Sequence, residues 1–205
     1  RAVQQRHESD DRIRRCGGLV IDGAMSTPLE AAGLNLNDTL WSAKALLECP
    51  DLVRKVHYDY YAAGANAVEA CSYQATEAAF ARKGIEKAEA SRLIRLSGEL
   101  VREAKNDVLL DHPEWDPADL LTAGSIGPYG AYLADGSEYT GAYDLTREEY
   151  YAFHQLRLDE LLNSGMDILA IETQPRFDEI EALLAMIAER DITCWVTVTL
   201  KDGDM

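Results

Sequence analysis

The stretch Asp-Ile-Leu-Ala-Ile-Glu-Thr-Gln-Pro, residues 167–175, carries the clearest signal about the fold. Its apolar run, residues 168–171, is followed by the carboxylate of Glu172 shortly before Pro175. A short continuous apolar run is typical of a parallel strand that is buried on both faces, and such folds place their functional side chains where strands end. The stretch therefore predicts a buried strand that delivers Glu172 to a site.

Apolar runs of the same kind recur along the chain. They occupy residues 18–22, 67–71, 120–123 and 194–200, and the first three end in small or polar residues. Segments with apolar residues at helical spacing lie between them, at 51–63, 86–106, 146–163 and 177–190, with shorter helical turns at 42–49 and 77–83. Five strands, each followed by a helix except the last, predict a parallel sheet with right-handed crossovers.

The pattern alone leaves two parallel architectures open, a doubly wound sheet and a (β/α)₈ barrel. No Gly-x-Gly-x-x-Gly follows the first strand, so the dinucleotide-binding version of the open sheet loses support. Asp51 is the predicted N-cap of its helix, and Thr146 is predicted to begin another. Residues 107–119 are predicted to form a surface excursion. The Gly- and Tyr-rich segment 129–143 is either a loop at the site or an exposed hairpin.

Composition excludes several classes of function. The chain has 205 residues, of which 47% are hydrophobic, enough for one sizeable core. A formal net charge of −16 repels phosphate, so no nucleic-acid partner is expected. No apolar run approaches the roughly 20 residues of a membrane span, and the N-terminus lacks a signal core. We therefore expect a cytoplasmic protein without a membrane partner.

The cysteines and the N-terminal segment favour simple interpretations. Four cysteines without a Cys-x-x-Cys pair predict free thiols packed in the interior. Residues 1–16 form a polar tail, and residues 17–205 form one domain. On residue type alone, Asp22 is either a helix or turn cap or a functional carboxylate.

Five segments together resemble the homocysteine S-methyltransferases, most closely the branch that uses S-methylmethionine or S-adenosylmethionine. They are Asp-Gly-Ala-Met (22–25), Leu-Trp-Ser-Ala-Lys (40–44), Ser-Tyr-Gln-Ala-Thr (72–76), the Gly- and Tyr-rich stretch 124–139, and Glu-Thr-Gln-Pro (172–175). The resemblance covers roughly residues 17–205. It implies a (β/α)₈ TIM barrel, a zinc ion, and methyl transfer from a sulfonium donor to homocysteine, which gives methionine.

The resemblance also implies roles for individual residues. Asp22 and Glu172 resemble the acidic positions that hold the substrate ammonium. The other residues implied to bind or shape around the substrate are Gly23, Ser72, Tyr73, Gln74 and Thr173. No residue of this chain is assigned to catalysis or to the metal. Ala24 departs from the family pattern, because many relatives have a second glycine there.

The resemblance further implies that the zinc is held by three cysteines beyond residue 205. Cys71 and Cys194 occupy other positions, so we do not expect them to be ligands. We expect a truncated homologue with five of eight barrel strands, whose open sheet edges favour self-association. The alternative function is a non-catalytic remnant that binds an amino acid or serves as an interaction module.

Overall fold

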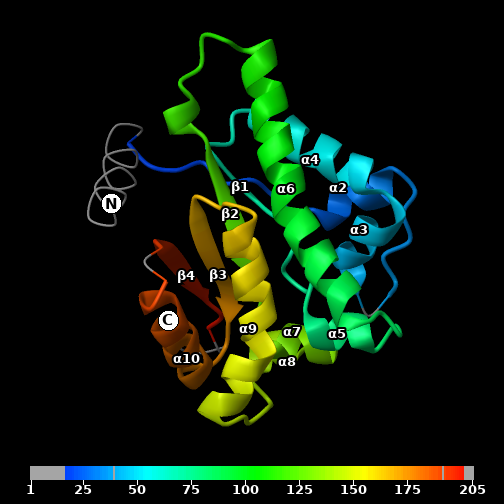
Figure 1. The fold of residues 1–205 in the computed structure, drawn as a ribbon, viewed down its shortest axis with the longest axis vertical. Coiled ribbons are helices and arrows are strands. Elements are labelled where there is room, and N and C mark those ends of the chain that lie inside the picture. Colours follow the sequence, from blue (N-terminus) through cyan, green and yellow to red (C-terminus); the bar gives the residue numbers. More distant parts are fainter. Residues whose placement is uncertain (1–16, 39, 191, 201–205) are drawn as a thin grey trace.

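The computed structural model describes residues 17–38, 40–190 and 192–200 (Figure 1). Its sheet consists of β1 (Ala67–Glu69), β2 (Leu121–Ile126), β3 (Ile168–Gln174) and β4 (Cys194–Val198). All neighbouring strands are parallel, as predicted. The prediction of a polar tail at residues 1–16 lies outside the described residues.

The predicted first strand is the main correction to the fold. Residues 18–22 do not form a fifth strand, and only an isolated parallel bridge joins Ile21 to Ala67. The carbonyl of Val20 accepts hydrogen bonds from the N–H groups of Asn66 and Ala67, at 2.7 and 3.2 Å. Gly17 and Gly18 precede this run and Gly23 follows Asp22, and glycine weakens strand pairing. The described part of the sheet therefore has four strands, against the five expected.

Strand order separates the two architectures that the sequence left open. The strands lie side by side in chain order, β1-β2-β3-β4. A doubly wound sheet reverses its strand order at a switch point, and the described strands show no reversal. The helices α4 (Pro50–Ala62), α6 (Lys87–Asp111), α9 (Arg147–Asn163) and α10 (Phe177–Ala188) follow the same order, each packing on the next (Figure 1). This sequential arrangement is that of a barrel wall.

Local sequence sets the helix boundaries. Thr146 caps α9 as predicted, with a capping box to Glu149. The N-cap of α4 is Cys49 rather than Asp51, because Pro50 takes the first helical position, where its missing N–H costs nothing. The prediction of an excursion from residue 107 is wrong at its start, since α6 continues to Asp111. The shorter helices are α2 (Ser26–Ala31), η1 (Trp41–Lys44), α3 (Ala45–Glu48), α5 (Glu77–Ala81), η2 (Pro117–Asp119), α7 (Tyr129–Leu133) and α8 (Ser137–Thr140).

The two faces of the sheet belong to different apolar clusters. The helix-covered face joins the main core, to which Val68, Ile126 and Leu169 belong. The opposite face carries a small separate cluster of Ala123, Ile168 and Ala170, with Trp195 packed against it. Because side chains alternate along a strand, the polar residues that continue this second face at the strand ends are Glu69, Ser125, Glu172 and Thr197. No helix in the described part of the chain is long and apolar enough to cross a membrane.

The free edge of β4 predicts self-association of a polypeptide limited to residues 1–205. In the described part of the sheet, β4 pairs with β3 only, and Val198 is 48% exposed. An exposed apolar edge strand is a template for pairing with another chain. Light scattering should show dimers or larger species, which Val198→Lys shifts toward monomer. Leu110→Lys removes an apolar residue that is 78% exposed on α6, away from the sheet, and should change nothing. A monomer at every concentration would contradict the prediction.

Candidate functional site

A cavity of about 740 Å³ opens at the carboxyl ends of the strands. Residues from all four strand ends line it, together with the segment before α2 and the segment around α8. Its described lining includes no lysine, arginine or histidine, but it includes five carboxylic acids, Asp22, Asp38, Glu69, Glu138 and Glu172. Such a lining attracts cations and repels anions.

Three of these acids lie together at the strand ends. The N–H of Glu69 donates to Oδ2 of Asp22 over 3.1 Å. The side chains of Glu69 and Glu172 line the same cavity, at the ends of β1 and β3. The hydroxyl of Ser125 donates to Oε1 of Glu172. The interpretation of Asp22 as a helix cap is not what the structure shows, since the N-cap of α2 is Met25 without a side-chain cap.

Burial dominates the electrostatics of the three acids, which we call the acid cluster (Asp22, Glu69 and Glu172). Desolvation, with a smaller contribution from the charge of Glu172, raises the pKa of Asp22 to about 7. Desolvation followed by the charges of Glu172 and Asp22 raises the pKa of Glu69 to about 9. Desolvation also raises the pKa of Glu172, against the lowering effects of Ser125, Glu69 and Arg157. The cluster therefore retains protons that exposed carboxyl groups lose.

The backbone around the cavity is strained. Trp41, Ala134 and Thr173 are the non-glycine residues with positive φ in the described ranges, at 46°, 56° and 58°. All three line the cavity. Thr173 follows Glu172 at an irregularity of the β3–β4 register, and its N–H donates to Oγ1 of Thr197 over 3.0 Å. Since a β-branched residue rarely adopts positive φ, this conformation is held by its surroundings and fixes where Glu172 points.

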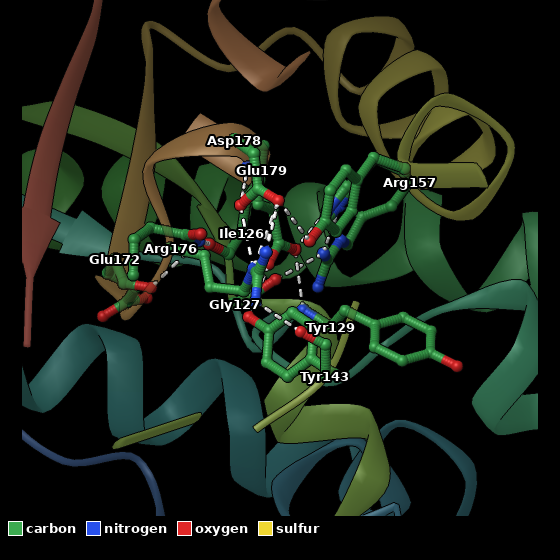
Figure 2. Close-up of polar contacts among 12 residues, drawn as sticks. Ile126, Gly127, Tyr129, Tyr143, Arg157, Glu172, Arg176, Asp178 and Glu179 are labelled. Atoms are coloured by element: carbon green, nitrogen blue, oxygen red, sulfur yellow. Dashed lines mark hydrogen bonds and ion pairs between the residues drawn. The ribbon is translucent and has the colours of Figure 1, made fainter. Parts of the chain in front are cut away.

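A buried arginine ties two walls of the cavity together. Arg157 of α9 is 1% exposed. Its guanidinium donates to the carbonyl of Tyr73 over 2.5 Å and to that of Gly127 over 2.7 Å, which joins the segments after β1 and β2 (Figure 2). It also donates to Nδ1 of His154 over 2.8 Å. Because arginine only donates, the proton of the neutral imidazole lies on Nε2.

The network continues from His154 to Glu179 of α10. Nε2 of His154 donates to Oε1 of Glu179 over 2.8 Å, and burial lowers the pKa of the imidazole to about 4. The Glu179 carboxylate also accepts from the N–H of Tyr129 and the hydroxyl of Tyr143, at 2.7 and 2.6 Å (Figure 2). The network therefore anchors both ends of the segment 129–143. This segment forms α7 and α8 at the cavity rather than an exposed hairpin.

The structure places the remaining predicted site residues differently. Gly23, Tyr73, Gln74 and Thr173 line the cavity, as do Asp22 and Glu172. Ser72 is not among the lining residues, because its side chain is buried and its hydroxyl donates to the carbonyl of Ser125 over 2.7 Å. Gln74 donates to the carbonyl of Ala131 over 2.9 Å, while its Oε1 is buried without a partner.

Sequence reasoning did not identify Glu69, Ser125 or Arg157. The signal for Glu69 was a charged residue inside the apolar run 67–71, where a buried strand does not tolerate charge unless it faces a site. Ser125 sits two residues after Ala123 and therefore shares its face of the strand. Arg157 lies in a helix with no clear polar stripe, and only the fold reveals its burial.

The described residues do not form a metal site. No group of three or more His, Cys, Asp or Glu side chains with suitable geometry occurs among them. Cys71 is buried, its thiol donates to the carbonyl of Ser42 over 3.3 Å, and burial raises its pKa to about 12. Cys49 and Cys194 are free thiols with intermediate exposure. Cys16 lies outside the described residues. Zinc coordination by this part of the chain does not fit.

Fold and site together define a parallel α/β protein of the TIM-barrel type with an acidic cavity at the strand ends. The family model described as homocysteine S-methyltransferase matches residues 19–205. The chain therefore belongs to the homocysteine S-methyltransferase family.

Individual relatives agree with this placement. A homocysteine S-methyltransferase of Escherichia coli strain K12 is 51% identical over 91% of this chain and 60% of its own length. The YbgG homocysteine S-methyltransferase of Bacillus subtilis strain 168 is 46% identical over 90% and 59%. The crystal structure of the E. coli homocysteine methyltransferase MmuM in its metallated form superimposes with a TM-score of 0.85, covering 90% of this chain and 64% of that one. The chain thus spans about 60% of the length of these relatives.

Replacing Arg157 tests the anchoring network. Arg157→Met leaves the carbonyls of Tyr73 and Gly127 and the imidazole of His154 without their donor. Breaking a buried charged interaction from one side costs about 3–5 kcal/mol, and we expect that loss in the free energy of unfolding measured with denaturant. Arg147→Met is the matched control on the same helix, because Arg147 is exposed and contacts Tyr151. Equal losses in the two variants would contradict the role of Arg157.

Proposed function

We propose that the natural protein carrying this chain transfers a methyl group from S-methylmethionine or S-adenosylmethionine to homocysteine and forms methionine. The observation that carries the proposal is the acid cluster in a cavity whose described lining has no basic side chain. Homocysteine presents an ammonium, and both donors present a sulfonium. A cavity of this charge favours these cationic groups. Family membership supports the same reaction. In the whole protein we expect an eight-stranded barrel and a cytoplasmic location.

The residues of this chain act by binding and orienting. Asp22 and Glu172 hold the substrate ammonium, and the Ser125 hydroxyl fixes the rotamer of Glu172. Tyr73 and Gln74 form the adjoining wall, and Ser72 supports that wall through the carbonyl of Ser125.

Glycine is needed close to Asp22. A Cβ on Gly23 would lie 2.9 Å from the hydroxyl of Tyr60, whose proton is donated to the carbonyl of Ala24. A larger residue at position 23 would therefore displace either Tyr60 or the backbone beside Asp22. Thr173 shapes the opposite side of the site through its positive φ.

Zinc is the metal that we propose for the whole protein. The proposal is supported by the relative whose structure was solved in a metallated form. Since the described residues supply no ligand set, we assign no reaction step of this chain to the metal.

Replacing Glu172 tests the ammonium site. In the natural protein, Glu172→Gln removes a charged acceptor of about 1.5–3 kcal/mol, so homocysteine affinity should fall by roughly 10- to 150-fold in calorimetry. Glu181→Gln removes the same charge from an exposed position on α10 and should leave the affinity unchanged. Unchanged homocysteine affinity in a folded Glu172→Gln variant would refute the assignment. Methionine formation with each of the two donors then tests the reaction itself.

Metal content tests whether residues 1–205 contain the zinc ligands. Catalytic zinc needs three protein ligands and an open position. A polypeptide of residues 1–205 should therefore hold no stoichiometric zinc after dialysis, measured by mass spectrometry, and should form no methionine. One tightly bound zinc per chain that is lost in Cys71→Ser or Cys194→Ser would show that these thiols are ligands.

A further inference from the structure

We infer that Glu138 and Gln74 form a second ammonium site in the cavity, which takes the amino group of the methyl donor. The inference rests on the proposed function, because it places the donor of that reaction in the same cavity. It adds a donor-binding residue, Glu138, and it predicts that the protein selects sulfonium compounds that are also amino acids. The two proposed donors, S-methylmethionine and S-adenosylmethionine, both carry such an amino group.

The acids of the cavity do not all serve the same purpose. Three of them form the acid cluster. Asp38 is paired with Lys83, whose Nζ lies 2.8 Å from its Oδ2. Glu138 of α8 differs from these four, because its Oε2 is buried and has no hydrogen-bond partner. A buried carboxylate oxygen without a partner is unfavourable, so the protein offers here an acceptor that a ligand can satisfy.

Gln74 supplies a second acceptor without a partner. Its side chain is 8% exposed and lines the cavity, and its Nε2 donates to the carbonyl of Ala131 over 2.9 Å. Because a carbonyl oxygen only accepts, the amide nitrogen faces Ala131 and the amide oxygen faces away from it. That oxygen, Oε1, is also buried without a partner. The orientation of the amide is therefore fixed, and its acceptor is left for a ligand.

The short helices α7 and α8 hold both acceptors in one wall of the cavity. Ala131, which fixes the Gln74 amide, follows Gly130 on α7. At Gly130 the two helices touch, since a Cβ there would lie 2.5 Å from the backbone nitrogen of Glu138 (Figure 1). On the side of β4, the hydroxyl of Thr199 donates to the carbonyl of Glu138 over 3.5 Å. Gln74 and Glu138 are thus attached to neighbouring points of the same wall.

An ammonium is the group that suits these two oxygens. One acceptor is a carboxylate and the other is a neutral amide oxygen, so the matching ligand group carries a positive charge and at least two hydrogens. A sulfonium has the charge but no hydrogen to donate. The ammonium of homocysteine is assigned to Asp22 and Glu172, so the second ammonium belongs to the donor. No bond of this amino group changes during methyl transfer, and the site acts by binding and orienting.

A matched pair of donors tests the inference. The compound 4-(dimethylsulfonio)butanoate has the sulfonium, the carbon chain and the carboxylate of S-methylmethionine but lacks the amino group. With the natural protein at saturating homocysteine, kcat/KM for this analogue should be roughly 10- to 150-fold lower than for S-methylmethionine, the factor that a hydrogen bond to a charged group supplies. Equal values for the two compounds would overturn the inference.

Glu138→Gln assigns this difference to a residue. The variant should lower kcat/KM for S-methylmethionine by the same factor, and should leave homocysteine affinity in calorimetry unchanged, in contrast to Glu172→Gln. With the analogue, the variant should equal the unmodified protein, because the group that Glu138 contacts is missing. The same loss is expected with S-adenosylmethionine. Glu181→Gln removes an equal charge from the exposed face of α10 and should behave like the unmodified protein.

Gln74→Leu tests the neutral acceptor independently of Glu138. It should lower kcat/KM for S-methylmethionine by roughly 2- to 10-fold, the range for a hydrogen bond between neutral and charged or polar groups at its weaker end. The value for the analogue should not change. If Gln74 only supported the wall through Ala131, the variant would lower the values for both compounds equally.

The outcomes distinguish the inference from the proposed function. Methionine formation by the unmodified protein, combined with a Glu138→Gln variant that affects S-methylmethionine and the analogue alike or affects neither, overturns the inference alone. Failure of the unmodified protein to form methionine from either donor overturns both. A loss that appears with S-methylmethionine and is absent with the analogue supports both.

Discussion

The guanidinium of Arg157 is the constraint on which the cavity depends. It is buried behind the strand ends, and it donates to carbonyls from the two segments that follow β1 and β2. Through His154 it reaches Glu179, which holds the entry to α7 and the ring of Tyr143. Loops at the carboxyl ends of parallel strands are otherwise free to vary. The directional hydrogen bonds of a buried guanidinium give these loops a fixed geometry.

The acid cluster destabilises the same region that Arg157 holds in place. Desolvation raises the pKa of each of its members, so the folded protein destabilises their ionised forms. The strained backbone at Trp41, Ala134 and Thr173 adds to this cost around the same cavity. Perturbed carboxyl groups and backbone strain in one cavity are typical of a ligand-binding site. The helix-covered side of the sheet is an ordinary apolar core.

The sequence predicted most of the fold because its signals were local. The apolar runs at residues 67–71, 120–123, 168–171 and 194–200 each became a strand, and the capping residues of α9, Thr146 and Glu149, are only three positions apart in the chain. The strand at residues 18–22 was predicted wrongly, since its pairing depends on neighbours that an isolated run of three apolar residues does not specify. α6 extends beyond its predicted end at residue 106, because Val108 is buried past the point where the helical pattern weakens.

Site residues followed a different rule. Asp22 and Glu172 end apolar runs, so position alone marked them, although their binding role stays a prediction. Glu69 and Ser125 sit within strands, and their exposure to the cavity depends on which face of the sheet lacks helices. Arg157 contacts residues 30 and 84 positions away in the chain. No local pattern encodes such a contact, and it requires the completed fold.

The face of the sheet that carries the acids also carries a small packed apolar cluster. Ala123 and Ala170 are small residues on the face of the sheet that carries the acids, and they are aligned with Glu69 and Ser125 in the strand register. A larger residue at either position would crowd its register partner, Glu69 or Ser125, and displace that side chain from its place at the cavity. Small side chains below and acids above therefore act together, since a carboxylate discriminates strongly between a cation and water only where water is scarce.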